Sequence, residues 1–216
     1  MERIPLFPLN TVLFPGMPLP LHIFEERYKL MIDHCIEESA PFGVVLIRSG
    51  EEVGGDAETY DFGATARIGR FQRLPGGGFN LLAVGTSRFH IERLDRGEPC
   101  LAGDVELVED VDATTPEAEA AAERVRGLFA EHFRLVLAVT GQWVNKLETP
   151  QTPAGLADFV ASQLELPPAA KQRLLEMLSV PERLREEIEM LGDSIRTLTE
   201  RWEERRSERF SGAALN

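Results

Sequence analysis

The sequence holds little of what most scaffolds and reactive sites are built from. Only two of its 216 residues are cysteines, Cys35 and Cys100, and no CxxC pattern occurs. A disulfide scaffold or a zinc ribbon needs more cysteines at closer spacing, so both are excluded. A free cysteine usually behaves as a small buried apolar group, and we expect this of both thiols.

Long apolar runs are also missing. No stretch of about 18 apolar residues is present, so no transmembrane helix and no membrane partner are predicted. The apolar N-terminus is interrupted by Pro5, Pro8 and Pro15, and it has neither a basic leader nor a small-residue cleavage site. We therefore expect a cytoplasmic protein.

The motifs of nucleotide and cofactor chemistry are absent. No GxxxxGK[ST] occurs to cradle phosphates, and the glycine cluster at residues 76–78 has no lysine beside it. No GxGxxG occurs for a dinucleotide, and no GxSxG for a nucleophilic serine. The sequence therefore predicts no cofactor, and residues 76–78 are interpreted as a hairpin turn.

Individual reactive residues give no stronger signal. His34 and Cys35 are adjacent, but neighbouring side chains on a helix point about 100° apart and do not converge on one metal. The lysines, Lys29, Lys146 and Lys171, leave a Ser–Lys dyad open. The sequence predicts no metal site, no catalytic residue and no enzyme, with an unrecognised hydrolase as the remaining catalytic alternative.

Negative charge dominates the chain. The net charge is −13, and residues 104–119 hold seven acidic side chains with no Lys or Arg. Such a surface repels phosphate backbones, so nucleic acid is not an expected partner. The nearest basic group is Arg67, Arg70 and Arg73, and this spacing alternates between the two faces of a regular strand.

The two halves of the chain differ in their pattern. The first half has short β-type runs, which are residues 3–7, 42–47, 64–74, 79–84, 88–94 and 101–108, with a helical stripe at 25–38 and a proline-interrupted edge segment at 10–21. The second half has helical runs, which are residues 116–139, a segment from 153, 169–178 and 182–206. We predict an α+β protein with a β domain at 1–111 and a helical domain at 112–216.

Two ordered blocks resemble the N-terminal domain of the Lon protease family. The first block has a P-L step, a V-x-F-P-G turn and an F-E-x-R-Y helix start, matched by Pro8, Leu9, residues 12–16, Phe24, Glu25, Arg27 and Tyr28. The second block, up to the strand end R-F-x-I, is matched by Gly63, Ala66, Ile68, Leu74, Pro75, Gly77, Gly85, Arg88, Phe89 and Ile91. The resemblance covers residues 3–110 well and the helices loosely.

The resemblance implies a PUA-like β pseudobarrel followed by a helical bundle with one long helix. It also implies a protein-binding role, because this domain engages protein substrates in the protease. The ATPase and peptidase modules of the protease have no counterpart in this sequence, so we expect a non-catalytic, non-proteolytic module that binds unfolded or partner polypeptides. A small-molecule sensor that uses the barrel pocket is the alternative.

Candidate site residues divide into two groups. Apolar residues near the proline-rich segment and the hairpin are candidates for a peptide groove, namely Phe7, Leu9, Phe14, Met17, Phe71 and Phe79. Motif residues with a structural interpretation are Pro15, Gly16, Glu25, Arg27, Tyr28, Gly63 and Arg88. Among these, Glu25, Arg27 and Arg88 are predicted to form a charged network that pins the helix start to the barrel.

The last helix has a seam of apolar residues at heptad spacing. Its members are Leu184, Ile188, Leu191, Ile195, Leu198 and Trp202. The seam is explained by packing against the helix that begins at Pro116, and it leaves a homodimer or an adaptor surface open as alternatives.

We predict that the purified protein neither hydrolyses ATP nor cleaves casein, because the sequence has no phosphate loop and no counterpart of the peptidase module. Phosphate release and casein digestion assays check this. ATP turnover that a point mutation in this chain abolishes would contradict it.

Overall fold

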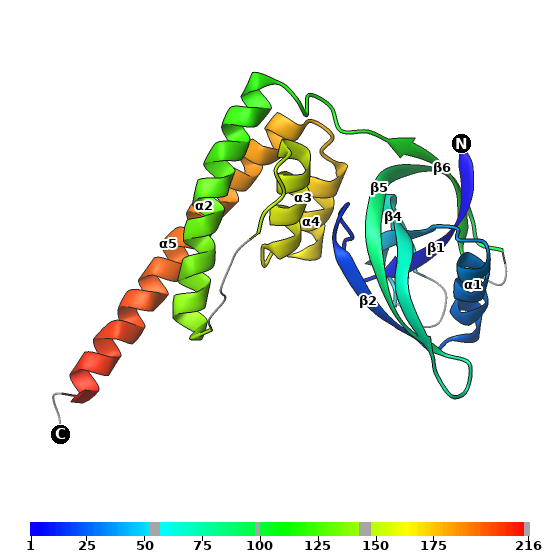
Figure 1. The fold of residues 1–216 in the computed structure, drawn as a ribbon, viewed down its shortest axis with the longest axis horizontal. Helices are drawn as coiled ribbons and strands as arrows, with labels where there is room; N and C mark the ends of the chain where they lie inside the picture. Colours follow the sequence, from blue (N-terminus) through cyan, green and yellow to red (C-terminus); the bar gives the residue numbers. More distant parts are fainter. Residues whose placement is uncertain (52–56, 98–99, 143–147, 214–216) are drawn as a thin grey trace. The chain divides into compact units, whose positions relative to one another are not determined.

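The computed structural model describes residues 1–51, 57–97, 100–142 and 148–213, with side chains up to Arg205 (Figure 1). In these residues six strands and five helices occur. The strands are β1 (Glu2–Leu9), β2 (Pro18–Ile23), β3 (Phe42–Ser49), β4 (Glu58–Arg73), β5 (Phe79–Asp95) and β6 (Ala102–Val108). The helices are α1 (Glu26–Glu37), α2 (Pro116–Thr140), α3 (Pro153–Gln163), α4 (Pro168–Glu176) and α5 (Val180–Ala213). The predicted α+β class, with a β pseudobarrel before the helices, is confirmed.

The six strands form one sheet that closes on itself. The order is β2-β5-β4-β3-β1-β6, and β6 pairs in addition with β5. The ring therefore runs β5-β4-β3-β1-β6 and back to β5, with β1 and β3 parallel and the other pairs antiparallel. β2 is not part of this ring and pairs edge to edge with β5.

The two longest strands change partners along their length. β5 pairs with β2 over residues 79–84 and with β6 over residues 88–95. β4 pairs with β5 from Phe62 to Arg73, but β3 accompanies it only as far as Ala66, which lies opposite Phe42. From Arg67 to Arg73 one edge of β4 therefore has no strand beside it among the described residues.

Apolar side chains fill the barrel. Phe42, Phe79 and Phe89 are fully buried. The helix α1 contributes to the same core with four buried residues, which are Tyr28, Met31, Ile32 and Cys35. Their spacing of three and four is that of a helix with one apolar face, as the sequence pattern predicted.

A β-bulge changes the faces on which the arginines lie. The β4–β5 register shifts between Ile68 and Arg70, so Arg67 lies opposite Val84 and Arg70 lies opposite Leu82. Val84 and Leu82 are two residues apart and share a face, and cross-strand partners point to that same face. Arg67 and Arg70 therefore share the outer face, which corrects the expectation of alternation.

The free edge of β2 carries two prolines. Gly85 N donates to Met17 O at 2.9 Å, and this bond fixes the phase of the β2–β5 ladder. Main-chain groups of Leu19, Leu21 and Ile23 then point to β5, and those of Pro18, Pro20 and His22 point outward. Proline has no N–H, so this edge offers few donors to an added strand.

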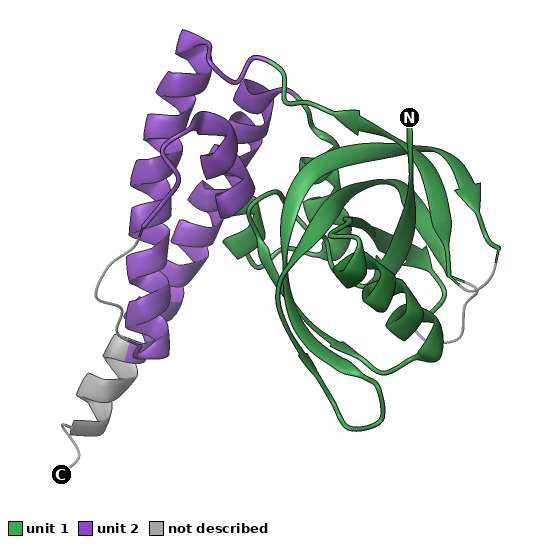
Figure 2. Cartoon of the chain, turned by 45° about the vertical axis from the view of Figure 1, so that its right-hand side comes forward, with its two compact units in different colours: residues 1–111, 161–178 green, residues 112–160, 179–216 purple. Residues whose placement is uncertain are grey.

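Contacts divide the chain into two units (Figure 2). The first contains residues 1–111 with 161–178, and the second contains residues 112–160 with 179–216. The helical segment at 161–178 thus belongs with the β barrel by contacts, and the unit boundary falls within α3. A division into folding domains at residue 111 stays a prediction.

The second unit is organised by the pair α2 and α5. The predicted start of α2 is confirmed, since the Thr115 side chain accepts from Ala118 N, and Gly141 ends the helix in a left-handed conformation. Leu184 and Leu191 are fully buried, and α5 packs along α2 in the same chain. These two residues are thus unavailable to a dimer seam, and Ile188, Ile195, Leu198 and Trp202 are half-buried. A homodimer stays a prediction.

Arg88 ties the end of α4 to the barrel within the first unit. Its side chain is 3% exposed, its Nε donates to Leu175 O at 3.0 Å, and it pairs with Asp110 at 3.3 Å. Nearby, Gln172 donates to Phe62 O at 3.0 Å. Buried polar groups need such partners, so these contacts fix the position of residues 161–178 on the barrel.

We expect Arg88→Met to lower the free energy of unfolding by about 3 kcal/mol, because it leaves a carbonyl and a carboxylate without their buried partner. Urea unfolding followed by circular dichroism measures this. Arg93→Met is the matched control: Arg93 also pairs with an aspartate, Asp104, but its side chain is 72% exposed, so the loss is below about 1 kcal/mol. Equal losses for both variants would contradict the assigned role.

Candidate functional site

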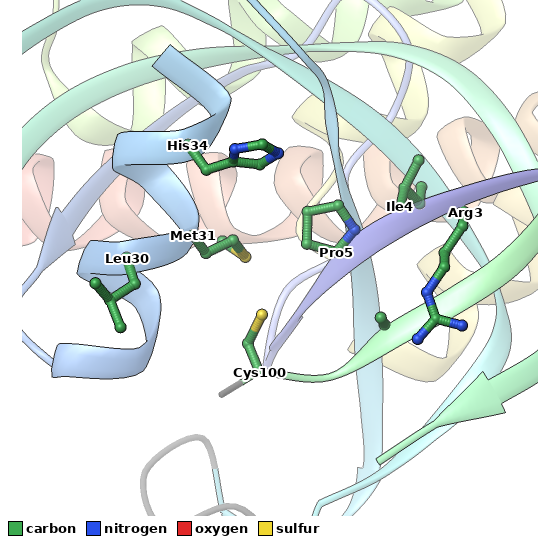
Figure 3. A pocket seen from close by; sticks show the side chains of 8 residues that line it. Arg3, Ile4, Pro5, Leu30, Met31, His34 and Cys100 are labelled. Carbon is green, nitrogen blue, oxygen red and sulfur yellow. The ribbon is translucent and has the colours of Figure 1, made fainter. Parts of the chain in front are cut away.

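A mostly apolar pocket of about 370 Å³ lies between α1 and the neighbouring strands β1 and β6 (Figure 3). Its walls are Ile4, Pro5, Leu30, Met31 and Cys100, with Arg3, His34 and Ala102 at its margins. Figure 3 shows the α1 side chains on one side and the β1 side chains on the other, with Cys100 between them. A volume of this size accommodates a large side chain or a small ligand.

The helix α1 supplies one wall because of its residue spacing. Leu30 and His34 are four residues apart, so they lie on the same flank of the helix, and Met31 turns from that flank into the core. Leu30 is 59% exposed although it is a leucine beside buried neighbours. An apolar side chain that the fold leaves in solvent at the mouth of a pocket is a candidate contact residue.

Charges at the rim of the pocket are paired with each other. Arg3 forms an ion pair with Asp95 and lies 3.8 Å from Asp104, which pairs in turn with Arg93 at 2.7 Å. The Arg3 guanidinium beside Asp95 holds the pKa of that carboxyl below its usual range. With its charges balanced in this way, the pocket favours an apolar group over an ion.

The two cysteines differ in access. Cys100 lines the pocket, whereas Cys35 is 2% exposed and lies on the other side of α1. Burial raises the pKa of Cys35 to about 11 and also raises the pKa of Cys100. His34 and Cys35 face different pockets, as adjacent helical residues should, and the described residues contain no group of three or more His, Cys, Asp or Glu that could hold a metal.

A second, smaller pocket of about 250 Å³ lies on the opposite flank of α1. It is formed by Cys35, Ile36, Ser39 and Ala40 at the end of the helix and by Arg67, Ile68 and Phe71 of β4. Phe71 is 48% exposed, and its ring lies 6.5 Å from that of Phe79. This pocket adjoins the edge of β4 that has no strand beside it.

Four of the six predicted groove residues are buried. Phe7 and Leu9 are 8% exposed, and Phe14 and Phe79 are fully buried. Their side chains belong to the core: the Phe7 ring lies 4.2 Å from the Tyr28 ring at a tilt of 38°, and Phe79 makes an edge contact with Phe71. These four candidates are therefore core residues in the structure, and a groove made of them would require the core to open.

The other two candidates, Met17 and Phe71, are at least partly accessible, but they lie in different places on the barrel. Met17 is half-buried against the core next to Gly85, and Phe71 lines the second pocket. Leu30, Pro5 and Cys100 line the first pocket and are not among the site residues predicted from the sequence. A signal for Leu30 was present, because it falls outside the stripe of Tyr28, Met31, Ile32 and Cys35 and yet is apolar.

The motif residues set backbone geometry and local pairing. Gly16 has a φ of 78° after Pro15, and a Cβ at Gly63 would lie 2.4 Å from Val44 O, so neither position suits another residue. Arg27 pairs with Glu25 at 2.9 Å and lies over the Tyr28 ring. Arg88 pairs elsewhere, with Leu175 and Asp110, so the predicted network of Glu25, Arg27 and Arg88 is wrong in its third member.

Comparison with known proteins agrees with this architecture. The family described as ATP-dependent protease La (LON) substrate-binding domain matches residues 3–193. The chain belongs to this family. Within it, the Lon protease of Methylocella silvestris is 28% identical over 188 residues, and that of Paraburkholderia phytofirmans is 31% identical over 202 residues. The matches cover 87% and 91% of this chain but 23% and 25% of those proteases, so the chain spans about a quarter of their length.

Solved structures of Lon N-terminal domains have the same fold. The chain matches the Lon N-terminal domain protein from Xanthomonas campestris with a TM-score of 0.62 and 27% identity, covering 86% of this chain and 96% of that one. It matches the N-terminal domain of the Mycobacterium avium complex Lon protease with a TM-score of 0.65 and 27% identity, covering 89% and 99%. The resemblance to Lon N-terminal domains found in the sequence is confirmed.

The helices contain no candidate membrane span in the part of the chain that the structure describes.

We expect iodoacetamide at pH 8 to modify Cys100 much faster than Cys35, as followed by mass spectrometry of peptides. The thiolate is the nucleophile, and about three units below its pKa only about 0.1% of the Cys35 thiol is ionised. Its burial slows the reaction further. Equal modification rates at Cys35 and Cys100 in the folded protein would contradict the difference in access between the two thiols.

Proposed function

We propose that this Lon substrate-binding domain binds exposed apolar segments of polypeptides through the pocket between α1 and β1. The observation that carries the proposal is Leu30, which is 59% exposed at the mouth of an apolar pocket of about 370 Å³. Leu30 adjoins the apolar pocket walls Ile4, Pro5 and Met31, and contiguous apolar surface of this kind is typical of a site that a partner covers.

The chemistry of the pocket supports a side chain as the bound group. Ile4, Pro5, Met31 and Leu30 offer contacts without fixed hydrogen-bond geometry, and methionine adapts to side chains of different shape. Recognition of this kind selects for apolar character rather than for one sequence. It suits a domain whose family is described as substrate-binding.

Non-catalytic action is part of the proposal. The family that matches is that of a binding domain, and the sequence carries no phosphate loop and no serine elbow. We infer that this chain acts by holding a polypeptide. Its cytoplasmic location also stays a prediction.

The alternative function, a small-molecule sensor, was expected to bind its ligand inside the barrel. The interior of the barrel is occupied by buried side chains, including Phe42, Phe79 and Phe89, and the pocket lies beside α1. A sensor would then use a pocket beside α1, and the pocket of about 370 Å³ is the one proposed for the peptide. Since a ligand that binds the folded state raises the melting temperature, a metabolite screen by thermal shift separates the two functions.

We expect Leu30→Ser to weaken binding of a fluorescein-labelled, carboxymethylated unfolded protein about tenfold, as measured by fluorescence anisotropy. Covering a leucine contributes about 1.5 kcal/mol, and about 1.4 kcal/mol corresponds to tenfold in Kd. Leu107→Ser is the matched control, because Leu107 is also an exposed leucine, at 50%, but it lies on β6 and does not line the pocket.

A native footprint tests the same pocket without a mutation. Bound polypeptide is expected to slow iodoacetamide modification of Cys100. Equal binding by Leu30→Ser and Leu107→Ser, with Cys100 unprotected, would remove the pocket as the binding site. Absence of binding to any unfolded protein would remove the proposed function itself.

A further inference from the structure

We propose that the open edge of β4 from Ile68 to Arg73 is a second polypeptide site, which adds an extended segment carrying alternating acidic and apolar residues as a further strand. The proposal rests on the proposed polypeptide-binding function and names another site and a class of sequence for it. Nothing in the α1–β1 pocket is needed for it, because the two pockets lie on opposite flanks of α1.

The main chain of β4 presents unpaired groups at this edge. Leu74 N donates to Gly78 O at 2.8 Å, which fixes the phase of the β4–β5 ladder at the hairpin. In an antiparallel ladder the pairs alternate, so Arg70 and Gln72 direct their N–H and C=O groups to β5. Phe71 and Arg73 then direct theirs outward. An extended peptide can accept and donate hydrogen bonds there.

A pocket accompanies this edge. Phe71 lies opposite Leu81, whose side chain is buried, so Phe71 belongs to the inner face although it is 48% exposed. Beside it is the space of about 250 Å³ between Ile68 and the end of α1 at Ile36. A peptide residue placed opposite Phe71 would point to this same face, where an apolar side chain would cover Phe71 and Ile36.

Charge selects the other residues of the segment. The bulge places Arg67 and Arg70 on the outer face, where peptide residues on either side of the apolar one would point. Residues 62–91 contain no Asp or Glu, although the chain holds 36 acidic residues. Arg73 pairs with Asp33 at 2.5 Å, while no ion pair of Arg67 or Arg70 occurs in the described residues. Glu37, the last residue of α1, and its C-cap Glu38 are exposed and do not line the pocket.

The occupant that fits is therefore an acidic extended peptide. A second copy of this edge would bring arginines against arginines, and like charges on neighbouring strands are unfavourable. A nucleic acid would find only two arginines here, one of which, Arg67, already donates to Ser39 O at 3.4 Å, in a protein with a net charge of −13. Phosphate binding relies on more neutralised contacts than this.

The experiment uses a short fluorescein-labelled peptide in which Asp and Val alternate, and a second peptide in which Lys replaces each Asp. Fluorescence anisotropy with the full chain measures both. We expect Arg70→Glu to weaken binding of the Asp peptide about fivefold, in line with exposed charge pairs. Arg124→Glu is the matched control, because Arg124 is an exposed arginine on α2, outside the sheet and outside both pockets.

A backbone variant tests strand addition. Phe71→Pro removes an N–H that points to the open edge and leaves the N–H groups that face β5, so it should abolish measurable binding or weaken it at least about tenfold. Phe71→Ala loses the ring but keeps the N–H and should fall between Phe71→Pro and the wild type. Thermal melting confirms that each variant is folded.

Residue-specific hydrogen exchange distinguishes strand addition, which protects main-chain amides, from binding through side chains alone. On addition of the Asp peptide, the amides of Phe71 and Arg73 should slow their exchange, and those of Arg70 and Gln72 should stay as they were. Equal binding of the Lys peptide, unchanged binding by Phe71→Pro, or displacement of the Asp peptide by a single-stranded oligonucleotide would each overturn the proposal. A different set of results would remove this site alone and leave the proposed function standing. In it, Leu30→Ser loses binding of the unfolded protein, Phe71→Pro retains it, and the Asp peptide does not bind.

Discussion

The unequal length of the strands is the constraint on which the other features depend. β4 and β5 have 16 and 17 residues, whereas β3 has 8 and β2 has 6. Short strands cannot accompany long ones to the end, so β5 changes from β2 to β6 and β4 loses β3 after Ala66. The barrel closes where β5 meets β6, and two edges stay open where strands run out.

The helix α1 lies where this closure is incomplete. Its buried stripe of Tyr28, Met31, Ile32 and Cys35 continues the apolar core, and its two flanks border the two pockets. The residues that line the pockets on α1, Leu30 and His34 on one flank and Ile36 on the other, lie outside the stripe that packs into the core.

Local patterns in the sequence were sufficient for much of the architecture. The stripe at 25–38, the turn after Leu74 and the cap at Thr115 depend on residues close together in the chain, and all three are present in the structure. The solvent exposure of single residues was harder to predict from the sequence. Phe14 follows a proline-rich edge pattern and yet is fully buried, because burial depends on what packs above it from distant parts of the chain.

Long-range contacts explain the remaining differences. The backbone partner of Arg88 is Leu175, 87 residues away, and nothing near Arg88 in sequence indicates this contact. The bulge after Ile68 needs one extra residue in one strand, and Gly69 is compatible with a bulge without requiring it. One residue of register changes which face an arginine occupies, so the distribution of charge on the barrel could not be obtained from spacing alone.

The two open edges are protected by different chemistry, and this difference has consequences for binding. On β2, Pro18 and Pro20 remove donors, and a missing N–H disfavours every added strand regardless of its sequence. On β4, the main-chain N–H donors remain, and arginine side chains lie beside them. Their positive charge repels basic partners and attracts acidic ones. Proline therefore closes an edge to all strands, whereas arginine closes it to basic strands and to a copy of itself. An edge guarded by charge alone stays accessible to an acidic segment, and in a chain with net charge −13 such an edge is the place where the sign of the surface is reversed.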